Sequence, residues 1–72
     1  MSKEHTRTYS KHTKNTVHLL AMANAIARKE RGYSETTVAE KINVYRSTVQ
    51  RLEKGDVKVG LGLYFEADRA VG

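Results

Sequence analysis

The sequence predicts an all-α fold of four helices in one small domain. Its 72 residues contain no proline and only five glycines, so long stretches of the chain are free of helix breakers. Apolar residues recur three or four positions apart, which is the helical period, whereas no credible pair of strands and no internal repeat is found. At this length a catalytic cleft is difficult to build, and no catalytic set of residues stands out. We therefore predict a protein that is not an enzyme.

A flexible basic arm is predicted before the first helix. The first nine residues contain almost no apolar side chain, a composition typical of a mobile segment. We place the arm at residues 1–13 and the helical domain at residues 14–72. It either lies along DNA, serves as a solvated tail, or adds a strand to a dimer mate. The cations we assign to it are Arg7, Lys11 and Lys14.

The first helix begins at a candidate N-cap, Ser10 or Thr13, and Gly32 ends it at the position where glycine is favoured. Two apolar stripes follow its period. One stripe consists of Val17, Leu20, Asn24 and Ala27, and the other of Leu19, Met22, Ala23 and Ile26. A helix with two such stripes either packs on two sides or meets another subunit with one of them.

The other three helices are marked by their own end signals. Ser34 caps the second helix, and Glu35 lies in its first turn, where a negative charge suits the helix dipole. Asn43 ends this helix, because asparagine tolerates the left-handed backbone conformation. The third helix covers about residues 46–54 and the fourth about residues 60–71. The apolar side of the fourth consists of Leu61, Leu63, Tyr64, Ala67, Ala70 and Val71.

The clearest pattern of the chain covers residues 35–54 and predicts a helix-turn-helix. Its apolar positions are Val38, Ile42, Val44, Val49 and Leu52. The small Ala39 allows two short helices to cross closely beside the turn at Asn43. The outward side chains of the second of these helices are Arg46, Ser47, Thr48, Gln50 and Arg51. Such hydrogen-bonding groups read base edges or bind phosphates, whereas in an ordinary helical hairpin they form only a solvated face.

The stretches 28–34, 38–42 and 46–55 resemble the Cro/CI (XRE) helix-turn-helix family, and the likeness covers about residues 17–72. This resemblance implies a compact, lambda-repressor-like DNA-binding domain that acts as a dimer on a two-fold operator. The side chains that it places in the major groove, for base contacts, are Arg46, Ser47, Gln50 and Arg51. The residues that we assign to DNA backbone contacts are Ser34, Glu35, Thr36, Tyr45, Thr48, Lys54 and Lys58.

The resemblance also implies a structural ion pair between Arg28 and Glu53, which holds the reading helix against the first helix. The alternative is two independent surface charges. Removing one partner of a buried pair costs about 3–5 kcal/mol, and far less when the pair is exposed.

Several positions depart from the family pattern. Glu35 stands where the family commonly has Gln, and its carboxylate repels phosphate unless backbone amides or nearby cations compensate. Tyr45 replaces the usual Ser or Thr, so the third helix loses a side-chain cap. Asn24 stands where an aliphatic core residue is usual, Asn43 stands for Gly, and Val57 stands for Pro. These changes leave the predicted fold intact and bear on the DNA contacts.

A narrower likeness concerns small regulators that are encoded beside HipA-type kinase toxins. The segments 7–11, 53–56 and 60–66 look like those of HipB-type antitoxins. Such antitoxins repress their own operon and bind the toxin. The likeness therefore implies a HipA-type kinase toxin as a partner.

We predict a sequence-specific repressor that binds a palindromic double-stranded DNA operator as a homodimer and regulates its own toxin–antitoxin operon. The 13 Lys and Arg against 8 Asp and Glu, a net charge of +5, favour an anionic partner. Two alternatives stay open. One is a prophage or plasmid Cro/CI-type repressor. The other is a protein-interaction module that has kept the fold and lost DNA binding.

Other kinds of site are not predicted. The spacings of His5, His12 and His18 do not make a helical metal pair, and the sequence has no cysteine, so we expect neither a metal nor a cofactor. No apolar run is long enough for a membrane helix, and no secretory signal is visible. We expect a cytoplasmic, nucleoid-associated protein with no membrane partner.

Overall fold

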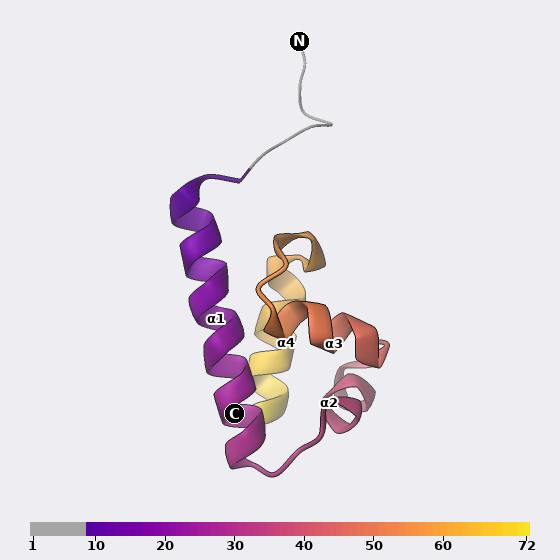
Figure 1. Ribbon diagram of the computed structural model, residues 1–72. Coiled ribbons are helices and arrows are strands. Elements are labelled where there is room, and N and C mark those ends of the chain that lie inside the picture. The colour runs from indigo at the N-terminus through magenta and orange to yellow at the C-terminus, as the bar shows by residue number, and fades with distance from the viewer. Residues whose placement is uncertain (1–8) are drawn as a thin grey trace.

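The computed structural model describes residues 9–72, which form four α-helices and one short 3-10 helix (Figure 1). The elements in chain order are α1 (Lys11–Glu30), α2 (Glu35–Ile42), α3 (Arg46–Glu53), η2 (Val57–Val59) and α4 (Leu61–Val71). Within residues 9–72 no strand is present, so the prediction of an all-α fold of four helices is confirmed. The long α1 lies beside α4, and α2 and α3 cross each other on the other side of α4 (Figure 1).

Helix α1 starts earlier than the predicted end of the basic arm. The Ser10 hydroxyl accepts a hydrogen bond from the backbone N–H of Thr13 at 3.1 Å, and this cap sets the helix start at Lys11. Lys11 and Lys14, which we assigned to a flexible arm, therefore lie in the first turns of a helix. Arg7 lies outside the described residues.

The turn between α2 and α3 has the predicted backbone conformation. Asn43 adopts the left-handed conformation, with φ 59 and ψ 50, and Val44 donates its N–H to the carbonyl of Ala39 at 2.9 Å. Ser34 caps α2 through the N–H of Thr37 at 3.0 Å. Tyr45 precedes α3 and makes no side-chain cap, as predicted, because its side chain has no acceptor oxygen close to the backbone.

Two clusters of buried side chains hold the helices together. The first joins α1, α3 and α4 through Val17, Ala21, Leu52, Tyr64 and Ala67. The second joins α2, α3 and α4 through Val38, Ala39, Val49 and Val71. Helix α3 contributes to both clusters, so its orientation is fixed by the whole core.

A buried amide interrupts the core face of α1. Asn24 is as buried as its aliphatic neighbours, and its Nδ2 donates to the carbonyl of Leu20 at 3.0 Å. Its Oδ1 has no hydrogen-bond partner within residues 9–72. The position where the family has an aliphatic residue is thus a true core position that carries an incompletely satisfied polar group.

Candidate nucleic-acid interface

Helix α3 presents a polar face to solvent. Val49 and Leu52 are buried against the rest of the domain, which turns the opposite side of the helix outward. The side chains that we assigned to base contacts all lie on α3, where Arg46, Ser47 and Arg51 are exposed and Gln50 is half-buried. Three of these four side chains are therefore accessible along one short helix, and its crossing with α2 is set by the buried Ala39.

A bidentate ion pair fastens α3 to α1. Arg28 donates from Nε to Oε2 of Glu53 at 2.6 Å and from Nη2 to Oε1 at 3.1 Å. Its Nη1 donates to the carbonyl of Tyr33 at 3.0 Å. The two side chains are only 13% and 12% exposed, and the hydrogen bond to Glu53 raises the pKa of Arg28 above its usual value. This geometry is that of a structural pair, not of two independent surface charges.

The carboxylate of Glu35 reaches across to the polar face of α3. Its Oε1 lies 3.6 Å from Nη2 of Arg46 and accepts a long hydrogen bond, 3.5 Å, from Nε2 of Gln50. The cation that compensates this carboxylate is therefore Arg46 itself. Two side chains assigned to base contacts share one acidic neighbour in the free protein.

A second carboxylate engages the other end of the α3 face. Asp56 Oδ2 accepts from Nε of Arg51 at 2.9 Å, while its Oδ1 caps η2 through the N–H of Lys58 at 2.9 Å. The backbone hydrogen bond from Lys58 and the side-chain bond from Arg51 lower the pKa of Asp56. The hydroxyl of the buried Tyr64 donates to the Asp56 carbonyl at 3.2 Å, which ties this loop to α4.

Most of the residues that we assigned to DNA backbone contacts flank the α3 face. Tyr45 is 83% exposed just before α3, and Lys54 and Lys58 are exposed after it. At the start of α2, Thr36 is exposed, whereas the Ser34 hydroxyl is already used as a cap. Thr48 is half-buried on α3.

Sequence reasoning missed the contacts of Asp56 and the shared contact of Glu35. Asp56 comes five positions after Arg51, beyond the end of α3, and the reversal of the chain at Gly55, with φ 82, returns it to the helix. Glu35 is distant in sequence from Gln50, and only the crossing of α2 and α3 brings them together. No local pattern signals either contact.

A family model described as Helix-turn-helix matches residues 25–66, more than half of the chain. The chain belongs to the Cro/CI-type helix-turn-helix family. The matched span runs from the last third of α1 to the middle of α4 and includes the whole α3 face. Comparison with curated proteins and with solved structures found no match. Membership of this family makes the protein a DNA-binding regulator of the XRE type.

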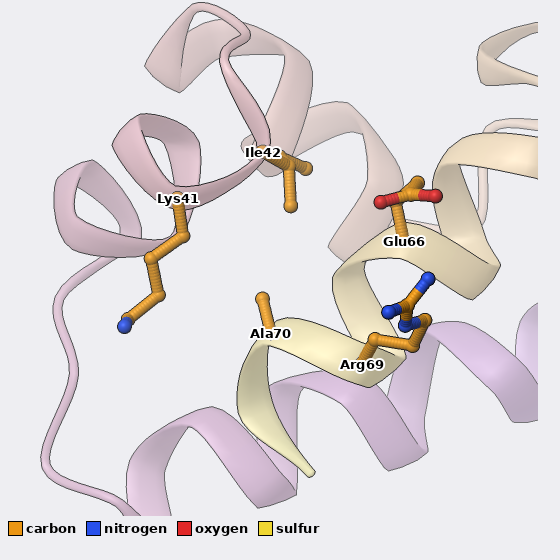
Figure 2. A pocket seen from close by; sticks show the side chains of 5 residues that line it. All are labelled: Lys41, Ile42, Glu66, Arg69 and Ala70. Atoms are coloured by element: carbon orange, nitrogen blue, oxygen red, sulfur yellow. The ribbon is translucent and has the colours of Figure 1, made fainter.

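A shallow hollow of this helix-turn-helix domain lies between α2 and α4. It occupies about 400 Å³ (Figure 2). Ile42 points into it, Ala70 forms part of its floor, and the charged groups of Glu66 and Arg69 lie on one side (Figure 2). It is wide open to solvent and lacks an enclosed wall, so it does not resemble a ligand pocket.

Other kinds of site do not emerge from residues 9–72. Within this range no group of three or more His, Cys, Asp or Glu side chains gathers as metal ligands would. In the same range no helix is both long enough and apolar enough to span a bilayer.

Proposed function

We propose that this protein is a sequence-specific repressor that places α3 in the major groove of double-stranded DNA. The observation that carries this proposal is the exposed row of hydrogen-bonding side chains on a helix whose back is fixed by the core and by the Arg28–Glu53 ion pair. A rigid reading helix holds its side chains in register with base edges, which a flexible segment does not do.

Side chains of the α3 face fall into two groups in this proposal. Arg46 and Arg51 carry planar guanidinium groups, which suit bidentate contacts with guanine, and Gln50 suits adenine. Ser47 completes the set of base contacts. Phosphates are contacted around the helix by the residues that we assigned to the DNA backbone, with the exception of the carboxylate of Glu35.

In the free protein, two carboxylates contact the side chains that we propose bind DNA. Glu35 contacts Arg46 and Gln50, and Asp56 contacts Arg51, so each long side chain already extends from α3 in the free protein. Exposed contacts of this kind are weak, about 0–1 kcal/mol, and a base edge or a phosphate replaces them at little cost. Because the carboxylates stay nearby, they also disfavour a badly placed phosphate.

We further propose that two copies bind a palindromic operator upstream of the protein's own gene, with half-sites about 34 Å apart, and block the promoter. The finer assignment, an antitoxin bound by a HipA-type kinase toxin, is supported by the likeness of the segments 7–11, 53–56 and 60–66 to HipB-type antitoxins. A prophage or plasmid repressor without a toxin uses the same DNA chemistry. In either form the protein acts at the nucleoid in the cytoplasm.

Fluorescence anisotropy tests the proposal with DNA from upstream of the gene and a scrambled duplex, each at two salt concentrations. We expect tight binding to the upstream DNA that resists competitor, and an affinity that falls steeply with salt, because phosphate contacts release counterions. Arg46→Ala should weaken specific binding by about 1–3 kcal/mol and relax the preference at one base position. Arg69→Ala, which removes an exposed cation on α4, is the matched control.

Equal, weak binding to both duplexes would overturn the proposal and favour the protein-interaction module. The antitoxin assignment is decided separately, by pull-down of a HipA-type kinase encoded beside the gene. A repressor that binds its operator and retains no such kinase is a prophage or plasmid repressor.

A further inference from the structure

The outer face of α1 is apolar and is covered by no other element within residues 9–72. Leu19, Met22 and Ile26 are 66%, 51% and 55% exposed, and the exposed Ala23 lies among them. These four residues are spaced three or four positions apart, so they share one side of the helix. We call this group the α1 outer face.

This face lies opposite the side of α1 that builds the core. Val17, Ala21 and Asn24 are buried against α3 and α4, and Arg28 continues that side toward Glu53. Because the core needs only that side, the fold itself does not account for an apolar outer face. Three large apolar side chains gathered in solvent on one helix are typical of an interface.

We infer that the α1 outer face is a dimer interface, in which α1 of a second copy packs antiparallel against it. The spacing of the face matches the seam of a two-helix coiled coil. A two-fold axis near Met22 and Ala23 places Leu19 of one copy opposite Ile26 of the other, and Met22 opposite Ala23. The face is thus complementary to itself, as a two-fold interface requires, and the small Ala23 leaves room for Met22.

Polar and charged side chains at the two ends of α1 favour the antiparallel direction. The exposed His12 lies on the outer side near the start of α1, and the exposed Glu30 lies on the same side at its end. An antiparallel pair brings Glu30 of one copy near His12 of the other, and it also aligns the helix dipoles favourably. A parallel pair instead sets Glu30 against Glu30 and Lys11 against Lys11.

The arrangement leaves the α3 face open. Helix α3 contacts the core side of α1, and the second copy would cover the opposite side, so the two sets of base-contacting side chains stay exposed. The inference deepens the proposed function, on which it rests for its purpose, because a palindromic operator requires two subunits related by a two-fold axis.

Sedimentation equilibrium without DNA tests the interface. We expect the natural chain to be dimeric and the double variant Leu19→Glu/Ile26→Glu to be monomeric, with at least a hundredfold loss of association. Phe65→Glu is the matched control, because Phe65 is 57% exposed on α4 and lies outside the α1 outer face. Circular dichroism confirms that each variant is folded. A monomeric natural chain, or a double variant that stays dimeric, would overturn the inference.

Cross-linking tests the direction without disturbing the apolar face. The natural sequence has no cysteine, so single cysteines placed at the exposed Asn15 and Glu30 are the only thiols. In the antiparallel pair Asn15 of one copy lies near Glu30 of the other, whereas the two Asn15 positions are about 22 Å apart along the helices. A short thiol cross-linker should therefore join Asn15→Cys to Glu30→Cys in a mixture. Cross-links formed only between identical variants would overturn the antiparallel pair.

The two proposals fail in different ways. A chain that dimerises through α1 and binds both duplexes equally supports the interface and refutes the repressor. A chain that binds its operator specifically while the α1 variants remain dimeric supports the repressor and refutes the interface.

Discussion

Glu35 illustrates how one residue controls the side chains of helix α3. Its carboxylate stands where the family commonly has a neutral Gln, and it contacts both Arg46 and Gln50. A neutral side chain at this position can still accept from Gln50, but it does not hold Arg46 by charge. In the function that we propose, this residue would shift the balance between the free α3 face and the DNA-bound one.

We predict that Glu35→Gln tightens binding to the operator by roughly two- to fivefold, because the variant removes an exposed ion pair and a repulsive charge near phosphate. Anisotropy titrations at low salt measure the change, and the difference should shrink as salt is added. Glu40→Gln, at an exposed position near the end of α2, is the charge-matched control. Weaker binding by Glu35→Gln than by that control would show that the carboxylate positions Arg46 for DNA.

Asp56 makes stability depend on pH. Its pKa in the folded state is lowered by the hydrogen bonds from Lys58 and Arg51, whereas in the unfolded chain it titrates near about 3.9. Folding thus favours the ionised form. Its contribution to stability is complete above about pH 5, and it is lost as pH falls through the unfolded and then the folded-state pKa.

Urea unfolding of the natural chain and of Asp56→Asn, at several pH values from about 6 to 3, measures this contribution. The natural chain should have the higher free energy of unfolding at pH 6, and its advantage over the variant should shrink as pH falls below about 5. A gap of constant size across this range would show that Asp56 titrates with its ordinary pKa in the folded protein.

At the scale of secondary-structure elements, two kinds of contact hold helix α3 in position. Val49 and Leu52 pack into separate apolar clusters, and Glu53 at its end is held by Arg28 of α1. The guanidinium also bonds the carbonyl of Tyr33, so the same side chain fixes the link between α1 and α2. The ion pair thus fixes the position of α3 in addition to stabilising the fold.

A double-mutant cycle on Arg28→Met and Glu53→Leu tests this picture. Each single variant should lower the free energy of unfolding by about 3 kcal/mol, because it leaves one largely buried charge without its partner. The double variant should lose much less free energy of unfolding than the sum of the two single losses, since both charges are removed. Urea unfolding supplies the four values, with Arg69→Met as an exposed control. Additive losses would mean that the two charges act independently.

The α1 outer face matters at the scale of the whole molecule. A domain of 72 residues buries a modest share of its surface, so the second copy that we infer on α1 would add a substantial fraction of its stability. Folding and association are then linked, and stability rises with protein concentration.

We predict that the thermal midpoint of the natural chain rises by several degrees between about 5 and 500 µM, because dimerisation stabilises the folded state by mass action. The Leu19→Glu/Ile26→Glu variant should show no such rise. Thermal scans followed by circular dichroism measure both chains. A midpoint of the natural chain that does not move with concentration would contradict a dimer that forms through the folded domain.

The sequence by itself determined the four helices, the end of α2 at Asn43 and the outward side of α3. These features follow from local rules, namely the helical period, the cap residues and the tolerance of asparagine for the left-handed conformation. The Arg28–Glu53 contact was implied only by resemblance, since the two residues lie far apart along the chain. The start of α1 was located no better than to Ser10 or Thr13, because both are good caps.

Only the tertiary structure decided which stripe of α1 is buried and which carboxylates meet the α3 face. The period of a helix defines its faces but not their neighbours, so the sequence cannot choose between two apolar stripes. In the fold, the stripe with Val17 packs into the core and the stripe with Leu19 is left in solvent. Likewise, the crossing of α2 and α3 brings Glu35 to Arg46, and the chain reversal at Gly55 brings Asp56 to Arg51. Neither contact can be predicted from the local sequence.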